Sequence, residues 1–335
     1  MKAVLMARGG GPEVLQLKEV AVAEPGPGYA RVALRAAGLN HRDIWQRIRY
    51  TDSEPAILGS DGAGVVEAVG GDGDVDDHWI GREVVINPSL NWGDREEAPG
   101  PGFEILGVPS PGTYAETVVV PVANLAPKPE HLDFLRAASL PLAGLTAWRA
   151  LFTQGRLAPG ATVLLPGIGS GVAGMALLFA KKAGARVIVT SSDDEKLKKA
   201  AALGADFGVN YSQDDWERQV REYAGNGGID LVVDHSGAKT LPAGLRLVRS
   251  GGRIVFLGST TGPNLSFTLR DVFFPQVHLI GTTMGSPREF RAMCGFVDLH
   301  RLAPDIHHVY PLAEAGQAHR LMEEGRQFGK IMLEI

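Results

Sequence analysis

The sequence predicts a two-domain α/β protein, in which a β-rich N-terminal region precedes a doubly wound parallel sheet. Three observations lead to this prediction. The 335 residues exceed what one compact core usually supports. Short β-branched runs bounded by turn residues fill residues 1–124. From Pro127 onward, continuous apolar runs alternate with helical patterns, which is typical of a parallel sheet covered by helices on both faces.

The N-terminal strands are predicted from short segments that alternate or are rich in β-branched residues. They are "RVALRAAGLN", "GAGVVEAVG", "GREVVINP" and "TYAETVVVP", and each is bounded by Gly, Pro, Asn or Asp. Between the last two lies a polar stretch rich in Pro and Gly, residues 89–112, which we expect to be irregular. The final segment, "GKIMLEI", is predicted to be a strand that rejoins this domain.

Six apolar runs predict the strands of the second region, which is the number that the Rossmann fold needs. They are "ATVLLP", "ARVIVTS", "DFGVNY", "IDLVVDHSG", "GRIVFLGS" and "VHLIGTTMG". Helical patterns such as "SDDEKLKKAAALGA" and "DDWERQVREYAG" separate them. We therefore expect one domain formed by residues 1–124 and 283–335, and a second formed by residues 125–282.

Composition excludes several classes of protein. The net charge is −5 and no Lys/Arg run is present, which disfavours nucleic-acid binding. No apolar run reaches 18 residues, so we expect no membrane association. The single cysteine, Cys294, excludes an intramolecular disulfide and a cysteine-based zinc cluster. A reducing, cytoplasmic location fits this cysteine usage best.

A glycine-rich stretch, "VLLPGIGSGVAGMA" (residues 163–176), lies between a predicted strand and a predicted helix. Gly169, Gly171 and Gly174 match the pattern G-x-G-x-x-G. Glycines let the backbone approach a pyrophosphate closely, and the start of a helix presents free N–H groups to that anion. The context therefore predicts a dinucleotide-binding loop. The alternative is a tight strand-to-helix turn that binds nothing.

The end of the second Rossmann strand indicates which dinucleotide is bound. NAD enzymes place an acidic residue there to hydrogen-bond the ribose, whereas this chain has Ser191. A serine does not repel a 2′-phosphate, Lys196 follows closely, and Tyr211 ends the next strand. Asp193 and Asp194 argue for NAD, but the run 192–195 also matches a helix capping box. We therefore favour NADP(H) over NAD(H).

The chain resembles the medium-chain dehydrogenase/reductase family, and in particular its quinone-oxidoreductase-like and zinc-binding alcohol dehydrogenase-like members. Besides the glycine loop, the matching stretches are "GLNHRDIW", "ILGSDGAGVVEAVG", "GTYAE", "ASLPLAGLTAWRAL", "VVDHSG", "GGRIVFLGSTTG" and "EGRQFGKI". The resemblance covers essentially the whole chain. It implies that the β-rich domain is GroES-like, that the chain is a homodimer or a dimer of dimers through the sixth strand, and that the substrate is a small molecule.

The resemblance also implies a set of cofactor contacts. It aligns the loop so that the packing residue of the helix is Ala173 rather than Gly174, with the phosphate contacts before it. The implied phosphate contacts are Gly169, Ser170, Gly171 and Val172. The resemblance also places Thr146 beside the nicotinamide and Lys330 at the pyrophosphate. After the fifth strand, it places Leu257, Gly258 and Ser259 near the nicotinamide ring.

The zinc ligands of the alcohol dehydrogenases are not matched. At the positions that the resemblance aligns with their catalytic ligands, this chain has Asn40, Ser60 and Leu142, and none is a good zinc ligand. The four cysteines of the structural zinc site are absent from the sequence, and its nine histidines are scattered. We therefore expect no metal.

Without zinc, hydrogen-bond donors or a general acid must stabilise the negative charge that hydride transfer builds on oxygen. The candidate catalytic residues are Asn40, His41, Tyr50 and Ser60, each of which also allows a purely structural role. The acidic Asp43 and Asp61 are expected to orient other groups.

Quinones and α,β-unsaturated carbonyls spread the developing charge by conjugation. This favours a zinc-independent NADPH-dependent oxidoreductase for such substrates. One alternative is an NAD(P)-dependent alcohol dehydrogenase or aldehyde reductase. Another is an NADPH-binding redox sensor or structural protein with little turnover.

Overall fold

The computed structural model describes residues 1–71 and 77–335, which form two compact units. Unit one contains Met1–Leu145 and Gly285–Ile335, and unit two contains Thr146–Met284. Residues 125–145, expected in the Rossmann domain, therefore lie in unit one. The reason is local packing: β10 (Leu125–Pro127) pairs with β6 (Glu83–Ile86), and α2 (Phe134–Ala138) packs on the strands of unit one.

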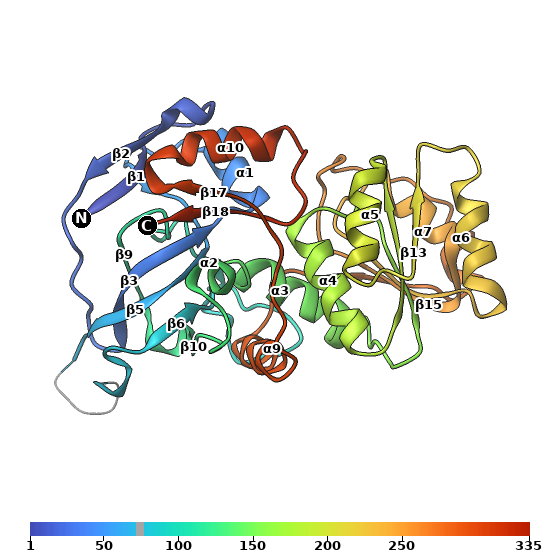
Figure 1. Cartoon of the computed structure of the whole chain (residues 1–335), viewed down its shortest axis with the longest axis horizontal. Coiled ribbons are helices and arrows are strands. Elements are labelled where there is room, and N and C mark those ends of the chain that lie inside the picture. Colours follow the sequence, from blue (N-terminus) through green and yellow to red (C-terminus); the bar gives the residue numbers. More distant parts are fainter. Residues whose placement is uncertain (72–76) are drawn as a thin grey trace. The chain divides into compact units, whose positions relative to one another are not determined.

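Unit one is built around β3 (Tyr29–Gly38), whose residues alternate between buried and more exposed positions over much of its length. It pairs with β5 (Asp61–Val69), β9 (Thr117–Pro121) and β18 (Lys330–Glu334), all antiparallel (Figure 1). The pairing of β18 confirms that the final strand rejoins the N-terminal domain. The remaining strands of this unit are β1 (Lys2–Met6), β2 (Leu15–Glu19), β4 (Ala56–Ile57), β7 (Ser89–Leu90), β8 (Glu104–Ile105) and β17 (Ile306–Pro311).

Two helices of unit one cover the core that supports the site. Helix α1 (His41–Arg49) follows β3 directly, and α10 (Ala315–Glu323) precedes β18. Both contribute to a core that includes Leu39, Ile44 and Tyr114. The start of α1 is thereby held against buried structure. Unit one also contains α2 and α9 (Pro287–Leu299). Helix α3 (Pro141–Trp148) begins in unit one, ends in unit two and continues as a π-helical segment, η4 (Arg149–Gln154).

Unit two contains a six-stranded parallel sheet in the order β13-β12-β11-β14-β15-β16 (Figure 1, green to orange). The strands are β11 (Thr162–Leu165), β12 (Arg186–Ser191), β13 (Phe207–Asn210), β14 (Ile229–Asp234), β15 (Val248–Phe256) and β16 (His278–Gly281). The helices are α4 (Gly171–Lys182), α5 (Asp194–Ala202), α6 (Trp216–Ala224), α7 (Leu241–Leu247) and α8 (Arg270–Phe273). All six predicted strands are confirmed, and with them the Rossmann prediction.

The strand order of unit two determines where a ligand would bind. The order reverses between β11 and β14, and the loops that leave the carboxyl ends of these two strands border a crevice in such sheets. The glycine loop follows β11, and His235 follows β14.

Over the residues that the structure describes, no helix combines the length and apolar content needed to cross a bilayer.

Candidate functional site

The glycine loop of unit two has a backbone that requires glycine at two positions. Gly167 has a φ of +71° and Gly169 a φ of +125°, which L side chains rarely adopt. Ser170 then begins α4, and its Oγ accepts a hydrogen bond from the N–H of Ala173 at 3.1 Å. The first N–H groups of α4 have no acceptor inside the helix, which is the arrangement that binds a pyrophosphate.

The register in which Ala173 is the packing residue stays a prediction. Ala173 is buried in α4. A Cβ added to Gly174 would meet no atom within 4 Å. The literal glycine pattern therefore ends on a residue for which packing does not require glycine.

His235, which follows β14, contacts the glycine loop and was not among the residues predicted from the sequence. Its Nε2 lies 3.2 Å from both the carbonyl oxygen of Gly167 and the Oγ of Ser170. Burial lowers the pKa of His235, and because a carbonyl only accepts, Nε2 carries the proton. The sequence signal that could have indicated His235 is the polar segment "DHSG" at the end of a predicted strand.

The residues after β15 approach His235 closely. The N–H of Leu257 donates to the carbonyl of Asp234 at 3.0 Å, and a Cβ on Gly258 would lie 2.2 Å from the carbonyl oxygen of His235. Gly258 is therefore required by a close approach of two backbones. Ser259 is exposed, and Thr146 is buried with its Oγ1 3.9 Å from Met284 Sδ.

The end of β12 carries the residues expected to select the cofactor. Ser191 is buried, its Oγ accepts from the N–H of Asp193 at 3.1 Å, and its carbonyl accepts from the N–H of Tyr211 at 3.0 Å. Tyr211 is exposed, and burial lowers the pKa of Lys196 in the first turn of α5. The helix cap needs a correction: Asp193, not Ser192, is the N-cap, and it accepts from the N–H of Glu195.

These features fit a dinucleotide. The positive-φ glycines, the N-terminus of α4 and the close approach at Gly258 supply a glycine-rich cradle at the switch point of the sheet. The phosphate contacts expected at Gly169, Ser170, Gly171 and Val172 lie in this cradle.

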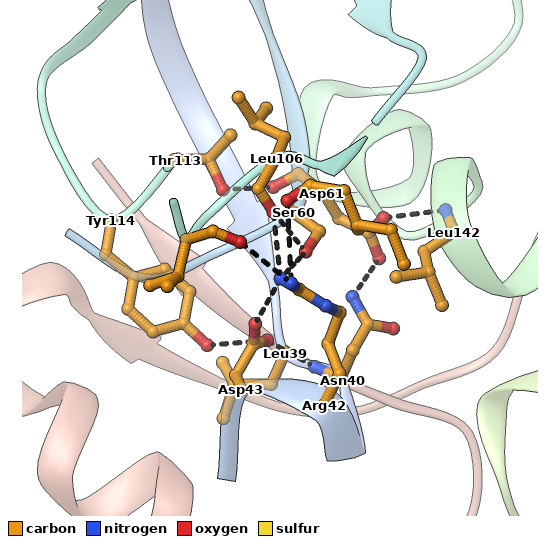
Figure 2. Close-up of polar contacts among 12 residues, drawn as sticks. Leu39, Asn40, Arg42, Asp43, Ser60, Asp61, Leu106, Thr113, Tyr114 and Leu142 are labelled. Atoms are coloured by element: carbon orange, nitrogen blue, oxygen red, sulfur yellow. Dashed lines mark hydrogen bonds and ion pairs between the residues drawn. The ribbon is translucent and has the colours of Figure 1, made fainter. Parts of the chain in front are cut away.

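In unit one, Asn40 and Asp61 belong to one buried polar cluster (Figure 2). The Nδ2 of Asn40 donates to Asp61 Oδ2 at 3.0 Å, and the N–H of Asn40 donates to Asp43 Oδ2 at 2.8 Å. The N–H of Leu142 donates to Asp61 Oδ1 at 2.7 Å. Asn40 therefore starts α1 and is held through both its backbone and its side chain.

Lys330 does not have the role that was expected for it. Its side chain is buried, and its ammonium donates to Leu39 O at 2.6 Å, Asn40 Oδ1 at 2.8 Å and Asp61 Oδ2 at 2.7 Å. An ammonium has three donors, so none remains for a pyrophosphate. The physical reason is Asp61, because a buried carboxylate without a cation is strongly destabilising.

Ser60 is also buried, and the proton of its hydroxyl is already donated. Its Oγ donates to Leu106 O at 2.7 Å and accepts from Arg42 Nη1 at 3.0 Å. Arg42 donates as well to the carbonyls of Leu106 at 2.9 Å and Val108 at 3.3 Å. Arg42 was not predicted from the sequence, although it directly follows the candidate His41.

A chain of buried groups leads from Asp43 into the core of unit one. Tyr114 donates its hydroxyl to Asp43 Oδ2 at 3.2 Å, and its oxygen lies 3.3 Å from His319 Nε2. Arg47 Nη1 lies 3.4 Å from His319 Nδ1. Because a guanidinium only donates, Nδ1 is the acceptor, Nε2 carries the proton, and the chain runs in one direction from Arg47 to Asp43.

Burial is the main influence on the protonation states of these hydrogen-bonded side chains. It lowers the pKa of His319 to about 3, with the Arg47 charge acting in the same direction. It raises the pKa of Asp43 to about 6, against the charge of Arg42. It also raises the pKa of Tyr114 well above its usual value. His319 is therefore neutral in the folded protein at neutral pH.

The two other catalytic candidates lie on α1 or at its end. His41 is the first residue of the helix and is half-buried, with its ring centroid 6.5 Å from that of Trp45. Tyr50 follows the last residue of α1, and its hydroxyl donates to the carbonyl of Glu54. The hydroxyl of Tyr50 is thus engaged by its own segment rather than by the polar cluster.

The residues at the expected metal positions do not fit zinc. Both side-chain polar atoms of Asn40 are paired with Lys330 and Asp61, the Ser60 hydroxyl is paired twice, and Leu142 offers a backbone donor. Within residues 1–71 and 77–335, no three His, Cys, Asp or Glu side chains group so that they could hold a metal ion.

Comparison with known proteins identifies two family models along the chain. The family model "Alcohol dehydrogenase GroES-like domain" matches residues 26–130, and "Zinc-binding dehydrogenase" matches residues 171–298. The zinc-type alcohol dehydrogenase-like protein YogA of Leptosphaeria maculans is 35% identical over 96% of this chain and 94% of its own length. A quinone oxidoreductase of Pseudomonas aeruginosa is 31% identical over 99% of both chains.

Among solved structures, an NAD-dependent alcohol dehydrogenase is 42% identical, covers 100% of both chains and superposes with a TM-score of 0.93. The chain therefore belongs to the medium-chain dehydrogenase/reductase family, in the group of zinc-type alcohol dehydrogenase-like and quinone oxidoreductase-like proteins. Members of this family are NAD(P)-dependent oxidoreductases, and the cradle in unit two fits such a cofactor.

The neutral state of His319 predicts a specific pH dependence of stability. Between about pH 6.5 and pH 3 the unfolded chain takes up a proton at this position that the folded chain does not. Stability from this residue is therefore lost as the pH falls. We expect His319→Gln to lower the free energy of unfolding by about 1–3 kcal/mol at neutral pH. The difference from wild type should narrow as the pH falls.

Denaturant unfolding curves of both proteins across this pH range measure the difference. Asp43 acts in the opposite direction, because its raised pKa favours the folded state at low pH, but it is present in both proteins and cancels on subtraction. His308→Gln, which replaces an exposed histidine of β17, is the matched control. A difference that stays constant across the range would contradict a neutral His319.

Proposed function

We propose that the protein is a zinc-independent oxidoreductase that uses NADPH to reduce a quinone or an α,β-unsaturated carbonyl compound. The observation that carries this proposal is the polar cluster of unit one. At the positions aligned with metal ligands it has side chains that are already hydrogen-bonded to each other, to backbone groups or to buried cations. The likeness to a quinone oxidoreductase supports the same substrate class.

Asn40 is the donor that we assign to the substrate oxygen. An amide nitrogen has two N–H groups, and the hydrogen bond to Asp61 uses one of them. The Lys330 ammonium, 2.8 Å from Asn40 Oδ1, polarises the amide and strengthens the other N–H as a donor. Ser60 orients the cluster, and we assign the proton that completes the reduction to His41 or Tyr50.

The nicotinamide, when bound, supplies the hydride. The phosphates are assigned to the N–H groups at the start of α4, and Ser191, Lys196 and Tyr211 are assigned to the ribose phosphate of NADPH. Thr146, Leu257, Gly258 and Ser259 are assigned to contacts with the nicotinamide ring. The 42% identical solved structure is of an NAD-dependent alcohol dehydrogenase, which favours NAD(H) and alcohol oxidation as the alternative.

A cofactor-oxidation screen tests the activity. We expect the purified protein to oxidise NADPH with quinones and conjugated enones, and to do so equally with and without a metal chelator. Simple aldehydes and alcohols are the comparison substrates, because without conjugation they need stronger stabilisation of the developing charge. Activity on alcohols that a chelator abolishes would support the alcohol dehydrogenase alternative. Tight NADPH binding without turnover on any substrate would support the redox-sensor or structural alternative.

Ser191→Asp tests the choice of cofactor. A carboxylate at the end of β12 can still accept the hydrogen bond from the N–H of Asp193, so the local turn is kept. It would repel a 2′-phosphate, and we expect NADPH affinity to fall by about tenfold or more while NADH affinity changes little. Fluorescence titration with both cofactors measures this, with Ser191→Ala as the uncharged control. An equal loss for both cofactors would contradict the assignment.

We also propose that the chain forms a homodimer or a dimer of dimers through β16. This strand is at the edge of the six-stranded sheet, so one side of its backbone is open to pairing. Leu269, Phe273 and Phe274 precede it and are 73%, 65% and 68% exposed, which is unusual for such large apolar side chains. A second copy would cover both features.

Light scattering after size-exclusion chromatography tests the oligomeric state. We expect the wild-type chain to elute as a dimer or a larger even-numbered oligomer, and Phe273→Glu to shift it toward the monomer. Leu299→Glu, at an exposed leucine at the end of α9, is the control for adding charge to an apolar position. A monomeric wild-type chain would exclude the proposal.

A further inference from the structure

Arg42 lies at the centre of the polar cluster of unit one, with its guanidinium between α1 and the 105–108 segment (Figure 2). The side chain is only 14% exposed. Its Nη1 contacts Ser60 Oγ at 3.0 Å and Leu106 O at 2.9 Å, and its Nη2 contacts Val108 O at 3.3 Å and Ile105 O at 3.5 Å. Every one of these partners is an oxygen atom that accepts from the cation.

The charges of the cluster are balanced without any further ion. It contains two fully buried carboxylates, Asp43 and Asp61, and two buried or largely buried cations, Arg42 and Lys330. Lys330 Nζ lies 2.7 Å from Asp61 Oδ2, and Arg42 Nη1 lies 4.0 Å from Asp43 Oδ1. A divalent cation added to this set would leave an excess of buried positive charge, which is costly in a poorly solvated site.

The Asp43 carboxylate forms an ion pair with Arg42. Asp43 Oδ1 is buried and has no hydrogen-bond partner among the described residues. The groups that act on Asp43 besides burial are Arg42 and Lys330, which favour its charged form, the N–H of Asn40, which does the same, and Asp61, which opposes it. Tyr114 reaches its other oxygen as a donor. Among the cations, the effect of Arg42 is the larger.

We propose that the Arg42 guanidinium is a resident cation that takes the place of a metal ion in this cluster. It balances the Asp43 carboxylate, directs the Ser60 hydroxyl toward Leu106, and holds the 105–108 segment through its carbonyls. Arg42 is thus a positioning residue, since its contacts are all with the protein. This inference deepens the proposed zinc-independent function, because it names the group that replaces the metal.

The test uses the resting full-length protein, produced in zinc-supplemented medium, without substrate. Metal content is measured by inductively coupled plasma mass spectrometry, and the unfolding temperature is measured with and without a chelator. We expect substoichiometric zinc and an unfolding temperature that the chelator does not change. Stoichiometric zinc whose removal lowers the unfolding temperature would overturn the proposal.

Variants of Arg42 test the charge itself. In Arg42→Met the cation is lost, so we expect the pKa of Asp43, followed by carbon NMR of labelled aspartate, to rise above its wild-type value. Arg42→Lys keeps the charge and should restore most of the difference, whereas a purely structural role would be lost in both. Arg49→Met, on the exposed end of the same helix, is the matched control. An Asp43 pKa that is equal in Arg42→Met and wild type would overturn the proposal.

If Arg42→Met does not fold, Arg42→Gln provides the neutral variant, and the metal measurement on wild type stands by itself. The result is separable from the proposed function. A metal-free protein with an Arg42-dependent Asp43 but no activity on quinones or enones would refute the proposed substrate class and leave this inference standing. Quinone reduction by a protein with stoichiometric, stabilising zinc would do the reverse.

Discussion

The pairing of buried carboxylates with buried cations is the constraint on which the site in unit one depends. Asp61 forms an ion pair with Lys330, and Asp43 forms one with Arg42. In this buried region a single unpaired charge would be strongly destabilising. These pairs bring together β18, β5 and the start of α1, which are far apart in the sequence. Asn40 and Ser60 are oriented as a consequence, because each is hydrogen-bonded to one of the charged groups.

Unit two depends on a different constraint, which is the close approach of backbones at the switch point of its sheet. Gly167 and Gly169 have positive φ, Gly258 leaves space for the carbonyl of His235, and His235 ties the loop after β14 to the glycine loop. Such a cradle holds an anion through backbone N–H groups and needs few side chains. Side chains matter at the end of β12, where Ser191 stands in place of an acidic residue.

The sequence predicted the six Rossmann strands because continuous apolar runs between helical patterns are a local signal. It also predicted the return of the last strand, which pairs with β3. It did not predict the role of Lys330, whose partners Leu39, Asn40 and Asp61 are distant in the sequence. His235 and Arg42 were missed for the same reason: each lies within a recognised stretch, but its function comes from contacts that local pattern does not encode.

The sequence by itself determined the fold class, the family and the residue types at the expected metal positions, because periodicity, glycine spacing and residue identity are properties of the chain. Only the tertiary structure decided which polar groups are free to act. The three donors of the Lys330 ammonium lie on partners in unit one, so none is left for a pyrophosphate. The Ser60 hydroxyl lies between Arg42 and Leu106 and already donates its proton to the Leu106 carbonyl. Burial makes such pairing obligatory, and burial is set by the packing of strands and helices that are distant in the sequence.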